Sequence, residues 1–142
     1  MAELVPVTVV GVLKQADDGP ERGERYFIML DATAADDARR LLIGVGDAEA
    51  TALALTMQHG AFPRPLTYQF AASLVEAAGS AVRSVRITER RDGIFYAKVM
   101  LRGGAVVDAR PSDAINLAAV TGAPVLVASD LLGLPDSLSP RS

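Results

Sequence analysis

The sequence predicts one α+β domain, in which antiparallel strands and helices occupy separate stretches of the chain. Short apolar segments of strand length are joined by turn residues, and a segment with helical apolar spacing follows each set of strands, so that strands and then a helix occur twice. A chain of 142 residues can bury about two-thirds of the surface that its unfolded form exposes. We therefore expect two similar α+β subunits packed as one domain.

Strands open the first half of the chain. Valine at alternate positions over 5–9 predicts a first strand, and Pro6 favours a sheet edge for it, because proline donates no ladder hydrogen bond. Turn residues fill positions 15–24. The apolar segment 26–30 predicts a second strand, and the segment 39–43 is its expected hairpin partner.

Two helices follow these strands. Apolar spacing predicts one helix that Asp47 caps and Gly60 ends, and a second that Thr67 caps and Gly79 ends. Two prolines keep most of the linker 62–67 out of helical conformation. The apolar faces are expected to comprise Ala50, Leu53, Ala54 and Met57 in the first helix, and Phe70, Ala71, Leu74, Val75 and Ala78 in the second.

The second half is expected to repeat the order of strands and then a helix. The predicted elements are a strand over 84–89, a hairpin turn at 91–93, strands over 94–101 and 105–109, a helix over 111–120 and a strand over 124–127. The domain then spans residues 1–133. The tail 134–142 holds two prolines and three serines and is expected to be frayed.

Composition excludes several classes of protein. The chain has no cysteine, which excludes disulfides, thiolate metal sites and a cysteine nucleophile. No segment approaches the ~20 apolar residues of a membrane span, and we expect a cytoplasmic protein with no membrane partner. The net charge of −3 has the wrong sign for general binding to phosphate backbones. Arginines nevertheless gather locally, at Arg39, Arg40, Arg83, Arg86, Arg90 and Arg91.

The most informative segment is the junction between the third strand of the second half and the last predicted helix. Asp108 and Arg110 end the strand, and Pro111, Ser112 and Asp113 begin the helix. Proline suits the first helical position, and oxygen atoms near the free N–H groups of a first turn stabilise it. A surface ion pair between Asp108 and Arg110 would contribute about 0–1 kcal/mol. A capped helix and a functional site both account for this junction.

Four motifs along the chain, taken together, resemble the bifunctional nuclease domain family. They lie in the family's order, at residues 43–50, 63–67, 92–97 and 108–114, and the resemblance covers about residues 26 to 132. The resemblance implies an α+β fold of two subdomains that are loosely similar to ferredoxins, often in an oligomer. Some members of the family degrade both DNA and RNA, whereas many bacterial members have no established activity.

The chain departs from the family pattern at one position that matters for chemistry. After Pro-Leu-Thr the family usually has His-Asp, and this chain has Tyr68 and Gln69. Neither replacement is a good general base or metal ligand near neutral pH. Tyr68 would still donate a hydrogen bond to a phosphate, which is binding rather than catalysis.

Two hypotheses of different kinds follow. The first is metal-assisted hydrolysis of DNA or RNA phosphodiester bonds with Mg²⁺ or Mn²⁺, since such sites use one or two carboxylates with several waters. The second is a non-catalytic binding or regulatory module in a homo-oligomer. The residues expected to act in catalysis are Asp108, Asp113 and Glu49, and those expected to bind substrate are Arg64, Arg110, Ser112 and Tyr68.

Three of the charged or titratable residues also have structural interpretations. The negative charge of Glu49 in the first turn of its helix would interact favourably with the helix dipole and stabilise the helix by about 0.3–1 kcal/mol. Arg64 lies between two prolines, where it suits a phosphate or an acid of the same chain. His59, at a predicted helix C-terminus, suits capping better than ligation because no other ligand is near it in the sequence.

Overall fold

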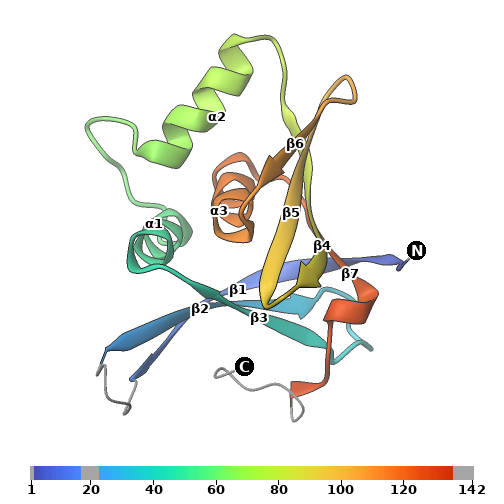
Figure 1. The fold of residues 1–142 in the computed structure, drawn as a ribbon. Helices are drawn as coiled ribbons and strands as arrows, with labels where there is room; N and C mark the ends of the chain where they lie inside the picture. The colour runs from blue at the N-terminus through green and yellow to red at the C-terminus, as the bar shows by residue number, and fades with distance from the viewer. Residues whose placement is uncertain (1, 17–22, 136–142) are drawn as a thin grey trace.

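The computed structural model describes residues 2–16 and 23–135 and confirms the α+β class (Figure 1). One seven-stranded sheet has the order β3-β2-β1-β7-β4-β5-β6. The predicted tail lies outside the described residues except for its first two positions. The elements are β1 (Leu4–Ala16), β2 (Glu24–Ala32), β3 (Arg40–Val45), α1 (Asp47–Met57), α2 (Thr67–Ala77), β4 (Val82–Arg91), β5 (Ile94–Leu101), β6 (Val106–Ala109), α3 (Pro111–Thr121), β7 (Val125–Ala128) and a 3-10 turn, η1 (Ser129–Leu131).

Strands followed by a helix do occur twice. The antiparallel strands β1, β2 and β3 precede α1, and the antiparallel strands β4, β5 and β6 precede α3. β7 joins these two sets, because it pairs antiparallel with β1 and parallel with β4. All seven strands therefore share one sheet. The further description as two ferredoxin-like subdomains stays a prediction.

The predicted edge position of the first strand is wrong. β1 lies between β2 and β7, in the interior of the sheet. In an antiparallel pair the carbonyl and N–H of a residue point to the same side, and the Pro6 carbonyl points toward β2. The N–H that proline lacks would point there too. Pro6 is tolerated because β2 ends at Ala32, before it reaches the position opposite Pro6. The Pro6 carbonyl accepts a hydrogen bond of 3.0 Å from the N–H of Thr33, so only one bond of the pair is lost.

Helices α1 and α3 cover one face of the sheet and close the core. Leu53 of α1 and Ile115 of α3 are fully buried against strand residues such as Ile28, Ile87 and Val127. α2 differs, because it packs on α3 and none of its described residues is buried. The apolar face predicted for α2 is therefore only partly covered.

The helix caps differ from prediction by one residue at two sites. Gly46 and Leu66 are the N-caps of α1 and α2, so Asp47 and Thr67 are the first helical residues. Neither N-cap accepts a side-chain hydrogen bond from the first turn. The predicted stop of α3 is confirmed, since Gly122 adopts a left-handed conformation with φ of 78°. No described helix is long and apolar enough to cross a membrane.

Candidate functional site at the junction of three helices

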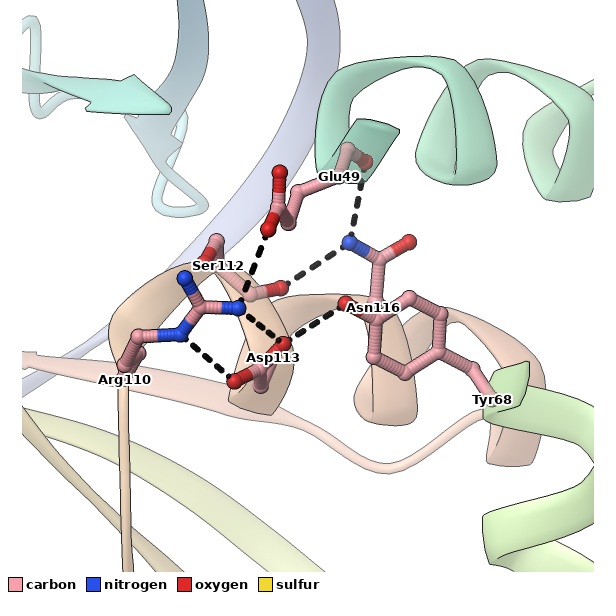
Figure 2. A network of polar contacts seen from close by, with 6 residues as sticks. All are labelled: Glu49, Tyr68, Arg110, Ser112, Asp113 and Asn116. Carbon is pink, nitrogen blue, oxygen red and sulfur yellow. Dashed lines mark hydrogen bonds and ion pairs between the residues drawn. The ribbon is translucent and has the colours of Figure 1, made fainter. Parts of the chain in front are cut away.

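Arg110 lies at the centre of a polar network (Figure 2). It is the N-cap of α3 in extended conformation, with Pro111 directly behind it in the first turn. Its Nε donates to Oδ2 of Asp113 at 2.8 Å, and its Nη2 donates to Oδ1 of Asp113 and to Oε1 of Glu49, each at 3.0 Å. One guanidinium therefore joins carboxylates from α1 and α3.

Tyr68 brings the third helix into this network. It is the second residue of α2, and its hydroxyl donates to Oδ1 of Asp113 at 2.7 Å. Figure 2 shows the ring reaching from α2 toward the first turn of α3. Asp113 thus accepts hydrogen bonds from both Tyr68 and Arg110.

Asn116 is a buried member of the network to which the sequence assigns no role. Its side chain is wholly buried, and its Nδ2 donates to the backbone carbonyls of Glu49 at 3.1 Å and Ser112 at 2.9 Å. Its Oδ1 has no hydrogen-bond partner among the described residues. The signal in the sequence was a polar side chain four residues after Ser112, on the buried face of a helix.

The contacts within the network shift the pKa values of Asp113, Tyr68 and Arg110. Hydrogen bonds from Arg110 lower the pKa of Asp113, although partial burial opposes them. Burial raises the pKa of Tyr68 above its ordinary value, and the hydrogen bond to Asp113 adds to this. The hydrogen bonds with Asp113 and then Glu49 raise the pKa of Arg110. These directions keep Asp113 and Arg110 charged and Tyr68 a neutral phenol near neutral pH.

These side chains line an open cleft of about 660 Å³ between α1 and α2. Glu49, Tyr68, Gln69, Arg110 and Asp113 all contribute to its wall. The Arg110 side chain is 64% exposed, whereas that of Glu49 is only 19% exposed. A ligand entering the cleft would thus meet the guanidinium first.

Three of the predicted site residues do not contribute a side chain to this cluster. Asp108 points away and forms an ion pair of 3.0 Å with Lys98. Arg64 is exposed in the linker before α2 and has no hydrogen bond or ion pair with any described residue. Ser112 is buried and takes part through its backbone carbonyl.

The donor set does not fit a bound divalent metal ion. Mg²⁺ at a phosphoryl-transfer site uses one or two carboxylates together with waters and substrate oxygens. Here Nη2 of Arg110 occupies the space between the Glu49 and Asp113 carboxylates, at 3.0 Å from an oxygen of each. Among the described residues no three His, Cys, Asp or Glu side chains are grouped so that they could hold a metal. The pair of carboxylates fits a guanidinium instead.

Comparisons with known proteins agree with the resemblance in the sequence. The family model described as "Bifunctional nuclease domain" matches residues 28–134. Two relatives from Mycobacterium tuberculosis are "Uncharacterized protein MT1877" of strain CDC 1551 / Oshkosh and "Uncharacterized protein Rv1829" of strain ATCC 25618 / H37Rv. Each is 37% identical to this chain over 106 residues, which cover 75% of this chain and 65% of the relative. The chain therefore belongs to the bifunctional nuclease domain family.

Proposed function

We propose that this chain is a non-catalytic binding or regulatory member of its family and that it acts as a homo-oligomer in the cytoplasm. The observation that carries the proposal is the bridge from Arg110 to Glu49 and Asp113. The carboxylates that would bind a metal or activate water are both engaged by one internal cation. The cluster thus braces α1, α2 and α3 against each other.

The side chain in the family's histidine position supports the same proposal. The Tyr68 hydroxyl donates a hydrogen bond to Asp113, and its raised pKa keeps the phenol neutral near physiological pH. A neutral phenol with such a pKa is a poor general base. Gln69 beside it has no ionisable group, so neither residue replaces the imidazole and carboxylate that the family usually has there.

The homo-oligomer is supported by the outer side of α2. Phe70 and Leu74, one turn apart in α2, are 56% and 55% exposed, and Leu66, one turn before Phe70, is 37% exposed. Contiguous exposed apolar side chains on a small domain are typical of an interface. A second copy of the chain would cover them.

Metal-assisted hydrolysis of DNA or RNA is the second candidate function. It is favoured by the convergence of Glu49, Asp113, Arg110 and Tyr68 in one open cleft, in a chain of this family. In this alternative a substrate phosphate would pair with Arg110 and free a carboxylate to act on water or to hold a cation. Asp108, Arg64 and the Ser112 hydroxyl would have no part in it.

A cleavage assay separates the two candidates. Purified chain is incubated with fluorescent single-stranded DNA or RNA in Mg²⁺, Mn²⁺ or EDTA, beside the variant Glu49→Gln/Asp113→Asn. The matched control is Asp108→Asn, which removes a carboxylate outside the cleft. We expect no metal-dependent cleavage, or traces equal in all three proteins. Cleavage that is lost in the double variant and kept in the control would overturn the proposal and support the second candidate.

A further inference from the structure

A pocket lies between α2 and the edge of the sheet that β5 and β6 form. α2 packs mainly on α3 and none of its described residues is buried, so its inner side does not close against these strands. The space between them has a volume of about 400 Å³, within the range of about 300–1,000 Å³ that is typical of small-molecule sites. We call it the α2–β6 pocket.

Most of the lining of the α2–β6 pocket is apolar. Val99 and Ala114, which belong to the buried core, form part of its wall. Ala71 and Val75 line it from the inner side of α2. Val107 of β6 also lines it and is 48% exposed, so the pocket is open to solvent. Because burial of apolar surface is favourable, this lining suits the apolar body of a ligand.

The polar side chains of the pocket gather at one end, where α2 and α3 begin. They are Thr67 and Tyr68 in the first turn of α2 and Asp113 in the first turn of α3. Figure 2 shows the hydrogen bond that joins Tyr68 to Asp113. Among the described residues that line the pocket only Asp113 is charged, and its side chain is 39% exposed. Arg110, its ion-pair partner, lines the neighbouring cleft instead.

This polar end can accept further hydrogen bonds. A carboxylate has about four lone-pair sites, and Asp113 uses three of them for Tyr68 and Arg110. The Tyr68 hydroxyl donates its proton in one of these bonds, so its oxygen can only accept another. Two acidic side chains, Glu49 and Asp113, also share one guanidinium here. The charge and the free acceptors favour a cationic, hydrogen-bond-donating group.

We infer that the α2–β6 pocket binds a small molecule with an apolar body and a primary ammonium head group. This inference rests on the proposed function, since it names the class of ligand that the binding module takes. An ammonium has three donors and no acceptor, which matches the oxygens of Asp113 and Tyr68. Phe70 and Leu74, on the outer side of α2, do not line the pocket, so a second copy of the chain would leave it free.

The test compares three probes that share an octyl chain and differ in charge: octylamine, octanol and octanoate. Isothermal titration calorimetry near neutral pH measures their affinities, and NMR spectra of ¹⁵N-labelled protein locate the bound probe. The pocket variant is Ala71→Leu, and its matched control is Ala72→Leu. Both alanines are half-buried in α2, but Ala71 lines the α2–β6 pocket, whereas Ala72 lines a separate cleft. The head-group variant is Asp113→Asn.

We expect wild-type protein to bind octylamine about fivefold more tightly than octanol, and octanoate most weakly, because Asp113 attracts the ammonium and repels the carboxylate. From butylamine upward, each added methylene should improve the affinity about threefold to fourfold until the pocket is full. Amide signals of Ala71, Val75 and Val107 should shift. This comparison needs no variant and therefore does not depend on how a substitution folds.

The variants test the location and the head group separately. Ala71→Leu should weaken octylamine binding about tenfold or more, because the larger side chain fills the pocket, whereas Ala72→Leu should change it less than about twofold. Asp113→Asn should remove the advantage of octylamine over octanol, because the charge that attracts the ammonium is lost. Circular dichroism checks the folding of every variant.

Three results would overturn the inference: equal affinities for the three probes, equal losses in Ala71→Leu and Ala72→Leu, or shifted amide signals that lie outside the pocket. Octylamine that converts an oligomer into monomers would also overturn it and assign the pocket to a second copy. Metal-dependent cleavage of nucleic acid that is lost in Glu49→Gln/Asp113→Asn would instead contradict the proposed non-catalytic function. The two failures are therefore distinguishable.

Discussion

Asp113 is the residue on which the helix junction depends. Its two oxygens accept three hydrogen bonds, from Tyr68 of α2 and from the guanidinium at the start of its own helix. In the sequence it resembles an ordinary acid in a helix first turn. In the structure the same carboxylate also binds Tyr68 of α2, a helix whose main packing partner is α3.

Removing the Asp113 charge should change the pKa of Tyr68, which donates a hydrogen bond to that carboxylate. In Asp113→Asn we expect the pKa of Tyr68 to fall part of the way toward its ordinary value, because the ionic acceptor is lost while burial remains. The pKa of Tyr68 is raised on folding, so its contribution to stability is complete below pH ~10 and is lost as pH rises toward the folded value. Ultraviolet titration of tyrosinate, with Tyr68→Phe for assignment, measures the shift; an unchanged titration would contradict the assigned hydrogen bond.

Gly46 makes room for the Glu49 carboxylate. A Cβ atom at position 46 would lie 2.5 Å from Oε2 of Glu49, although the backbone conformation itself, with φ of −73°, suits alanine. We expect Gly46→Ala to displace the carboxylate from Arg110 at a stability cost below about 1 kcal/mol, since the pair is partly exposed.

A double-mutant cycle checks the Gly46 prediction. Glu49→Gln should cost less in the Gly46→Ala background than in the wild type, because the ion pair is already weakened. Gly44→Ala is the control, since its Cβ would make only an ordinary contact of 3.7 Å with Phe27. Full additivity of the two substitutions would be evidence against the displacement.

At the scale of elements, Asn116 links α1 to α3 from within the core. Leucine at this position would remove both hydrogen bonds to helix carbonyls, and we expect a loss of about 1–3 kcal/mol in the free energy of unfolding. Asn116→Asp should cost more, because a carboxylate would face two carbonyl oxygens. Urea denaturation measures both variants, and a smaller loss for aspartate would count against the described bond pattern.

α2 is the element most exposed to a partner. Phe70→Ser/Leu74→Ser should change the folded monomer little, because both side chains are more than half exposed, and should shift the chain toward monomer. Light scattering after size exclusion measures the shift. Val10→Ser, at an exposed apolar position of β1, is the control. A wild type that is already monomeric would refute the proposed oligomer.

At the scale of the whole molecule, one core joins both sets of strands. Val127 of β7 is fully buried in that core, and its register partners are Val5 of β1 on one side and Ile87 of β4 on the other. We expect Val127→Ala to cost about 1–3 kcal/mol and to leave a single unfolding transition. Far- and near-ultraviolet circular dichroism should report the same midpoint in urea. Separate transitions would show that the two sets of strands unfold independently.

Local sequence patterns predicted most helices and strands, but they did not predict which elements lie next to each other in the fold. Turns such as Asp92-Gly93, with φ of 52° and 77°, follow from residue chemistry alone. The sheet position of β1 depends on β7, which is far away in the sequence, so the rule for proline at an edge misplaced it. The same holds for α2, whose amphipathic spacing predicts a buried face regardless of whether this chain supplies the cover.

The candidate site was predicted in part for the same reason. Glu49, Tyr68, Arg110 and Asp113 do meet, although they come from three different helices. Asp108 was misplaced because a strand residue two positions before Arg110 faces across the sheet to Lys98. Asn116 was missed because its only sequence signal is a polar side chain on the buried face of a helix, and that signal does not tell which backbone carbonyls the side chain binds.

The late position of β7 in the chain bears on how the protein emerges from the ribosome. Leu4 must pair with Ala128, so the two three-stranded sets stay unjoined until nearly all of the described chain has been made. Until then β1 and β4 each present an open strand edge, which is a template for pairing with other chains. Closure over so long a loop is also slow. Synthesis that pauses before residue 125 should therefore leave a nascent chain prone to aggregation, which a chaperone would need to shield.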